Sequence, residues 1–213
     1  MVICYRVAQK SKKLLVDNGL IFLGLTAWKL ILSFLGVWNS KKIDTGIIFI
    51  SLIFHTVYAI KKSNYIREIP ILQKQYRFSM DIKPLGGKNA RWTSIFRATA
   101  TGYDCCSASG DRAPAIFLHP GSNNKIHICN SINGRGNACV NPIIPTNKFS
   151  HVTVQQIKEG DKYQYSILVN HNEIYTVENK KARSYESVNV YMGDNYYAPA
   201  DAVVQNYHFE NLE

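Results

Sequence analysis

The sequence of 213 residues lacks several short motifs that would assign a function directly. It contains no Asn-x-Ser/Thr sequon, no internal repeat, no low-complexity tract and no lipidation signal. The C-x₂₋₄-C spacing of compact zinc sites is also absent. Charged residues are sparse at 19 %, and no convincing helical pattern follows Pro70. These absences exclude a repeat architecture, a lipid anchor of known type and an obvious zinc knuckle, while the missing sequon is neutral on secretion.

Paired acids of the kind that hydrolyse glycosidic bonds are missing too. Two side chains share one side of a strand only at even spacing, whereas Glu173 and Glu178 are five residues apart. Nucleophilic catalysis would need a cysteine thiolate paired with a histidine. His127 and Cys129 share one face of a strand, but this spacing implies no hydrogen bond between them, so the pattern does not favour such a pair. The sequence therefore predicts a protein that is not an enzyme.

Basic residues are distributed unevenly along the chain. Residues 1–70 hold ten Lys and Arg against three Asp and Glu, a net charge of +7. Residues 71–213 hold fifteen against twelve, a net charge of +3. Because the charge excess belongs to the N-terminal part, it favours a segment that flanks a membrane over a nucleic-acid surface. We predict no nucleic-acid partner.

The N-terminal part contains two apolar runs. They predict that residues 1–70 form a hydrophobic, helical leader or membrane anchor. Residues 21–38 are apolar except for Lys29, and residues 46–60 are apolar around His55. If uncleaved, residues 21–60 could contact a membrane as a helical hairpin, with both ends in the cytoplasm. A pair of buried helices is the alternative that needs no membrane.

Export is a further alternative for the second run. Lys41 and Lys42 precede it, and Val57-Tyr58-Ala59 fits the small-residue pattern before a signal-peptide cleavage point. On this interpretation the residues before Lys41 are an additional leader or an extension of the gene model. We favour export, so that the protein is secreted or lies at the cell surface, where an uncleaved apolar segment would anchor it in the membrane.

Four of the five cysteines agree with an oxidising compartment. Cys105, Cys106, Cys129 and Cys139 lie within one 35-residue stretch, which suggests disulfides in a small β module. Adjacent cysteines rarely bond each other, so Cys105 and Cys106 would each need another partner. Cys129 and Cys139 could close a short loop together, or join Cys105 and Cys106; free thiols and a metal site are the remaining alternatives.

From Gln75 onward the hydrophobic period is two, which predicts strands. In QYRFSMDIK the residues Tyr76, Phe78, Met80 and Ile82 face one way. Asn170-His171-Asn172 predicts a hairpin turn, and Asn133–Asn137 is expected to be a flexible tip. We expect a second domain at 71–213, an all-β antiparallel two-sheet jelly-roll sandwich. The expected strands cover 75–83, 92–100, 113–118, 125–132, 149–157, 163–169, 173–177, 188–192 and 203–209.

The order of these segments resembles a known superfamily. The stretches YRFSMDIKP, PAIFLHPGSNNKIHI, FSHVTVQQ, YQYSILVNHNEIYTVEN and VYMGDNYYAPADAVVQNYHFENL are similar to the laminin-G-like or pentraxin-like branch of the concanavalin A-like lectin/glucanase superfamily. The resemblance covers about residues 72–213. It implies a jelly roll that binds glycans or proteins, sometimes through Ca²⁺ at the rim. This chain departs from the family at Ala200-Asp201-Ala202, where a glycine is commoner.

Loop residues supply the candidate binding groups. Asp194, Asn195, Tyr196 and Tyr197 combine ring faces with planar polar groups, as sugar sites do, and Tyr103 with Asp104 could contribute from another loop. A possible Ca²⁺ would use Asp104, Asp194 and Asp201, since calcium prefers oxygen ligands; no other cofactor is implied. We expect a non-enzymatic recognition module for a glycan or an extracellular protein. The alternatives are a membrane-associated structural or adhesive protein without a small ligand, and a degenerate glucanase-fold hydrolase.

Overall fold

The computed structural model of the chain describes residues 56–102 and 108–212. The apolar run at 21–38, most of the run at 46–60, and Tyr103, Asp104, Cys105 and Cys106 lie outside the described residues. The predicted helical character of the N-terminal segment and the predicted calcium role of Asp104 therefore stay predictions. Within the described ranges, no helix has the length and apolar character needed to cross a membrane.

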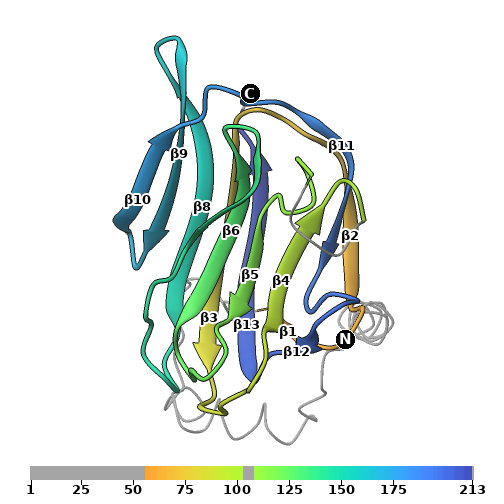
Figure 1. The fold of residues 1–213 in the computed structure, drawn as a ribbon, viewed down its shortest axis with the longest axis vertical. Helices are drawn as coiled ribbons and strands as arrows, with labels where there is room; N and C mark the ends of the chain where they lie inside the picture. Colours follow the sequence, from red (N-terminus) through yellow and green to blue (C-terminus); the bar gives the residue numbers. More distant parts are fainter. Residues whose placement is uncertain (1–55, 103–107, 213) are drawn as a thin grey trace, which may run out of the picture. The chain divides into compact units, whose positions relative to one another are not determined.

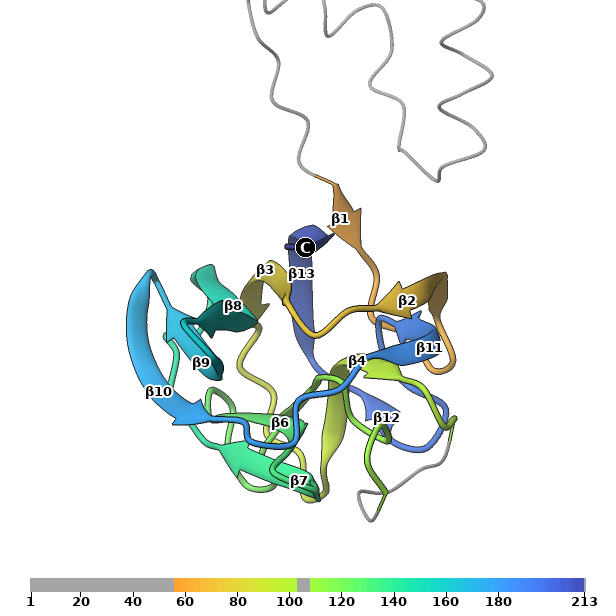
Figure 2. The same cartoon turned by 90° about the horizontal axis from the view of Figure 1, so that it is seen from above.

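Two β-sheets form the two layers of a sandwich (Figures 1 and 2). Apart from a parallel pairing between β12 and β4, every described strand pairing is antiparallel. The six-stranded sheet has the order β1 (Val57–Tyr58), β13 (Ala202–Asn211), β3 (Tyr76–Pro84), β8 (Ser150–Glu159), β9 (Lys162–Val169) and β10 (Asn172–Glu178). The seven-stranded sheet has the order β2 (Tyr65–Leu72), β11 (Tyr185–Tyr191), β4 (Thr93–Thr99), β5 (Ala115–Leu118), β6 (Ile126–Ile132) and β7 (Arg135–Val140), with β12 (Ala198–Pro199) beside β4. The predicted all-β, two-sheet class is confirmed.

The core lies between the two sheets and follows the predicted alternation. Strand β3 buries every second side chain, and Phe78 and Ile82 have no exposed surface. The Phe78 ring lies 5.8 Å from that of Phe96, on the opposite sheet, and 4.8 Å from that of Phe209. The alternation in the sequence therefore identified the core face of this strand correctly.

Strands begin earlier than the expected domain start at residue 71. Strand β1 pairs with β13, and β2 pairs along its length with β11. The alternation of β2 was hidden because this edge strand buries few side chains, chiefly Ile69 and Leu72. A cleavage after Ala59 would separate β1 from the sandwich.

The expected tip at 133–137 is a two-residue turn followed by a strand. Asn133 and Gly134 have φ angles of 54° and 77°, the left-handed geometry of tight hairpin turns. Strand β7 therefore begins at once with Arg135 and pairs with β6. The predicted hairpin at residues 170–172 is confirmed, with Asn170 at φ 51° and His171 at φ 66° between β9 and β10.

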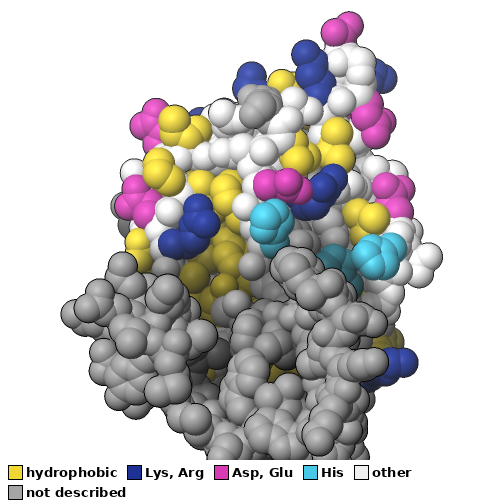
Figure 3. Space-filling view, turned by 180° about the vertical axis from the view of Figure 1, so that it is seen from behind, with side chains coloured by type: hydrophobic (Ala, Val, Ile, Leu, Met, Phe, Trp, Pro, Cys, Tyr) yellow, Lys and Arg dark blue, Asp and Glu magenta, His cyan; other side chains and the backbone are white. Residues whose placement is uncertain are grey.

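The outer face of the six-stranded sheet carries histidine, acidic and basic side chains (Figure 3). Nδ1 of His151 lies 2.7 Å from Oδ1 of Asp81, and the His171 ring stacks on His151 at 5.0 Å. Arg77 donates to Glu210 at 2.8 Å. This face is a network of paired polar groups.

Asp81 is expected to make stability depend on pH at the acid end. Burial acts to raise the pKa of its carboxyl, but hydrogen bonds from His151, Asn206 and Gln205 together lower that pKa below 3.8. A folded-state pKa below the unfolded value stabilises the fold above the unfolded pKa, and this contribution is lost as pH falls through the folded pKa. Asp81→Asn should therefore lose less Tm on acidification than the wild type.

Circular dichroism melts between about pH 2 and pH 7 would test this expectation. Asp161→Asn, at the exposed turn after β8, is the matched control and should keep the wild-type acid profile. If the Tm of wild type and of Asp81→Asn fell equally on acidification, the prediction would be contradicted.

Candidate functional site

The outer face of the seven-stranded sheet presents aromatic and histidine side chains. Ile126 and Ile128 of β6 enter the core, so His127 and Cys129 lie on the opposite, outer side. On β5, Ile116 and Leu118 are likewise core residues. The same alternation places Phe117 on the outer side, next to His127, its register partner on β6.

Trp92, immediately before β4, is the centre of this group. Its ring centroid lies 4.5 Å from that of His127, 4.7 Å from that of His119 and 6.5 Å from that of Phe117. Trp92, His119 and His127 are each partly exposed. We call Trp92, Phe117, His119, His127 and Tyr197 the aromatic face.

Tyr197 extends the aromatic face from the loop that follows β11. Its ring lies 5.1 Å from that of Phe117 in an edge-on arrangement. The Arg112 guanidinium lies 4.8 Å from the centroid of Phe117 and donates to Oδ1 of Asn137 on β7. The face thus combines ring surfaces and an exposed amide, with the buried guanidinium of Arg112 against both.

A second arginine supports the neighbouring tyrosine. Arg97 on β4 is only 2 % exposed, and its Nε and Nη2 donate to the carbonyl oxygen of Asp111 at 3.3 and 3.2 Å. Its guanidinium lies 5.2 Å from the ring centroid of Tyr196, which is 43 % exposed. The Tyr196 hydroxyl donates to the carbonyl oxygen of Gly102. Tyr196 therefore has a defined position at the surface.

Asp194 occupies a different place from the one predicted. Its side chain is fully buried, and Oδ1 accepts the backbone N–H groups of Tyr196 and Tyr197 at 3.0 and 2.7 Å. A carboxylate in this position closes an Asx-type turn and cannot reach a ligand at the surface. Of the four predicted loop residues, Asn195 and Tyr196 are exposed and Tyr197 is partly exposed. Asp194 orients the two tyrosines.

Residues 61–64, which connect β1 to β2, form hydrogen bonds with residues 192–194 at the start of the loop that carries Tyr196 and Tyr197. The N–H of Lys61 donates to the Met192 carbonyl at 3.2 Å, and the N–H of Ser63 donates to the Asp194 carbonyl at 3.0 Å. Gly193, at φ 88°, lies so close to Lys61 that a Cβ would collide with the Lys61 carbonyl oxygen. Residues 61–64 therefore fix the backbone from which Tyr196 and Tyr197 project.

His127 is held as a neutral imidazole. Burial lowers its pKa, and the positive charges of Arg112, His119 and Lys125 act in the same direction. The hydrogen bond to Asn141 acts oppositely but is smaller. The aromatic face therefore offers an uncharged ring at neutral pH.

Cys129 and Cys139 form a disulfide between β6 and β7. The two residues are direct register partners, with Cα atoms 4.1 Å apart. Of the pairings left open by the sequence, the structure contains this one. Cys105 and Cys106 themselves lie outside the described residues, so their pairing stays a prediction.

Asp201 is placed at a turn and not at a cluster of oxygen ligands. Its Oδ2 accepts the N–H of Gly87 at 2.8 Å, and its carbonyl accepts the N–H of Leu85. In the described parts of the chain, the one group of three His, Cys, Asp or Glu residues arranged to hold a metal is His127, Cys129 and Cys139. The calcium prediction for Asp194 and Asp201 thus gains no geometric support.

The sequence interpretation missed the partly exposed Trp92 and the buried Phe117 and Arg112 that lie beneath it on the outer side of the sheet. The signal was present, because inward Ile126 and Ile128 imply an outward His127 on the same strand. Trp92 begins the expected strand at 92–100, but only the sheet order β4-β5-β6 brings it beside His127.

No protein-family model and no curated protein matches this sequence. Solved structures similar to it include the native heptameric SAP-like pentraxin from Limulus polyphemus, 15 % identical with a TM-score of 0.47 over 70 % of each chain. Alginate lyase AlyC3 in complex with dimannuronate is 10 % identical with a TM-score of 0.47 over 75 % of this chain and 74 % of that one. Carbohydrate-binding module CBM66 from Bacillus subtilis is 14 % identical with a TM-score of 0.37 over 66 % and 77 %. At these identities and TM-scores the likenesses concern the fold alone.

Proposed function

We propose that this protein is a non-enzymatic recognition module that binds a glycan through the aromatic face and the adjoining Tyr196. The observation that carries the proposal is the partly exposed Trp92, set among His119, His127 and Phe117 on one side of a sheet. Sugars offer C–H groups that pack on such rings and hydroxyls that need planar polar partners. Asn137, Asn141 and Asn195 are exposed amides on the strand and loop that border these rings.

The positions of the acids support binding without hydrolysis. Asp111 is buried, with Oδ2 accepting the N–H of Ala108 and Oδ1 accepting the Thr101 hydroxyl. Asp194 is buried and accepts two backbone N–H groups. Both carboxylates are thus committed to holding loops, whereas glycoside hydrolysis needs two carboxyls that reach the bond.

The disulfide supports the proposed location. Cross-links of this kind persist in oxidising compartments and are rare in the reducing cytosol. We therefore place the module outside the cell or at its surface, with the N-terminal apolar segment as leader or anchor. An extracellular protein is the other ligand class that the exposed Tyr196 would suit.

Trp92→Ala is expected to weaken binding to the glycan about 5- to 30-fold, because loss of one stacking ring costs on the order of 1–2 kcal/mol. A glycan array probed with the purified protein identifies the ligand, and calorimetry on the strongest one compares the variants. Tyr163→Ala, on β9 of the other sheet, is the matched control and should bind like the wild type.

The same samples test the remaining parts of the proposal. Mass spectrometry of the glycan after incubation should find it intact, and cleavage products would overturn the non-enzymatic assignment. Equal affinity of Trp92→Ala and wild type would remove the aromatic face as the site. An array with no bound glycan, together with protein-protein capture, would favour the protein ligand.

A further inference from the structure

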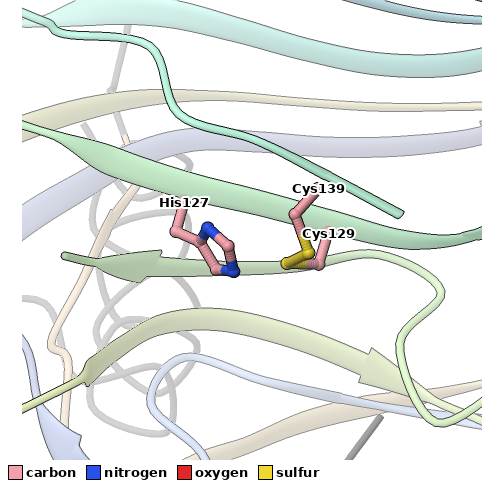
Figure 4. Close-up of side chains that lie close together, drawn as sticks. All are labelled: His127, Cys129 and Cys139. Atoms are coloured by element: carbon pink, nitrogen blue, oxygen red, sulfur yellow. A yellow bond between two sulfur atoms is a disulfide. The ribbon is translucent and has the colours of Figure 1, made fainter. Parts of the chain in front are cut away.

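Three metal-ligating side chains meet at the edge of the aromatic face. The ligand atoms of His127, Cys129 and Cys139 all lie within 4.8 Å of one another. Figure 4 shows the His127 imidazole next to the two sulfur atoms on the same side of the sheet. The spacing His-x-Cys and then ten residues to Cys139 matches no compact zinc motif, so the sheet and not the sequence spacing creates this group.

Two features of the sheet produce the arrangement. His127 and Cys129 are two residues apart on β6 and therefore share a face. Cys139 is the register partner of Cys129 on β7, which places its sulfur beside the same pair. The backbone that supports all three ligands is an antiparallel ladder, and its register holds the Cα atoms of Cys129 and Cys139 4.1 Å apart.

The histidine is oriented as a ligand would be. Nδ1 of His127 lies 2.6 Å from Oδ1 of Asn141. Because an amide oxygen only accepts hydrogen bonds, Nδ1 carries the proton and Nε2 keeps its lone pair. This second contact is the kind that fixes the tautomer and ring angle of metal-bound histidines.

We infer that the dithiol form of this protein binds a zinc-type cation through His127 Nε2 and the sulfurs of Cys129 and Cys139. A dithiol reductant supplies two electrons and two protons, which convert the disulfide into two thiols while the reductant becomes a disulfide. The cation then displaces one proton from each thiol. The disulfide form holds both sulfurs in a covalent bond and has no thiolate to offer, so oxidation and metal binding exclude each other.

The ligand set selects the class of metal. Two thiolates and one imidazole suit zinc and cobalt(II) in tetrahedral geometry and do not suit calcium or magnesium. Three protein ligands leave a fourth position for water or another ligand. Cys129 is buried while His127 and Cys139 are partly exposed, so the open position faces the solvent side.

Cobalt(II) titration of the full chain tests this inference. Cys4, Cys105 and Cys106 are first replaced by serine, so that Cys129 and Cys139 are the only thiols. After reduction with a phosphine and its anaerobic removal, we expect one cobalt per chain, near-ultraviolet thiolate-to-cobalt bands, visible bands of tetrahedral cobalt, and displacement by zinc. Without reduction the same protein should show none of these bands.

Matched variants separate this site from adventitious binding. His127→Ala is expected to lower cobalt affinity at least about tenfold, and Asn141→Ala about 10- to 100-fold, because Asn141 orients the ligand. Cys129→Ala with Cys139→Ala should abolish the thiolate bands. Circular dichroism of each variant confirms the fold.

Three results would overturn the inference. They are absent thiolate bands in the reduced protein, equal cobalt binding by oxidised and reduced protein, and unchanged affinity in a folded His127→Ala variant. The glycan proposal does not depend on any of them, because it is tested on the oxidised protein without metal.

Discussion

Phe78→Ala is expected to lower the free energy of unfolding by about 3–5 kcal/mol, the range for a fully buried phenylalanine. Phe78 has no exposed surface and contacts the rings of Tyr76, Phe96 and Phe209. Phe96 belongs to the other sheet, so the substitution opens a cavity where the two layers meet. Transfer of the lost ring to water and the unfilled cavity both contribute to the cost.

Urea unfolding followed by tryptophan fluorescence and circular dichroism measures this effect. Phe149→Ala is the matched control, because Phe149 is partly exposed and mainly meets the Lys83 ammonium, 4.8 Å from its centroid. It should cost about 1 kcal/mol or less. Similar losses for the two variants would show that Phe78 is not at the centre of the core.

Replacing Cys129 and Cys139 together by alanine is expected to cost about 2–3 kcal/mol, the chain-entropy value for a short loop. The two positions are ten residues apart and join neighbouring strands. Removing the bond lets the unfolded chain explore more conformations, while the β6–β7 ladder itself stays intact. Alanine is preferred to serine because Cys129 has no exposed surface.

Peptide mapping of the wild-type protein without reduction provides the control for this pairing. We expect a cross-linked peptide pair that contains Cys129 and Cys139, and reduction should separate this pair and make both cysteines alkylatable. A link from either residue to Cys105 or Cys106, or wild-type stability in the double variant, would contradict the assignment.

Local alternation predicted the fold well where one side of a strand is buried. QYRFSMDIK identified β3 and its core face, and Asn170-His171 identified the β9–β10 turn. Strands β2 and β7 were missed for a physical reason. They are the outer strands of the seven-stranded sheet and bury too few side chains to leave a period of two in the sequence.

The candidate site was less accessible to sequence reasoning, because it depends on strand order. Tyr196 and Tyr197 were correctly placed in a loop, but nothing local shows that Asp194 is turned inward to hold them. Trp92 and His127 are 35 positions apart and meet only across β4, β5 and β6. The alternation of apolar and polar residues predicts which face of the sheet a side chain lies on. Which residues are its neighbours on adjacent strands depends on the strand order.

The hydrogen bonds from residues 61–64 to the loop after β11 have a mechanical consequence. Strand β1 has only two paired residues, Val57 and Tyr58, before this connector begins. Tension applied through the chain upstream of Thr56 would first load that short pairing and then the ladder at Met192–Asp194. The backbone that carries Tyr196 and Tyr197 is therefore part of the load path, together with β13, to which β1 is paired.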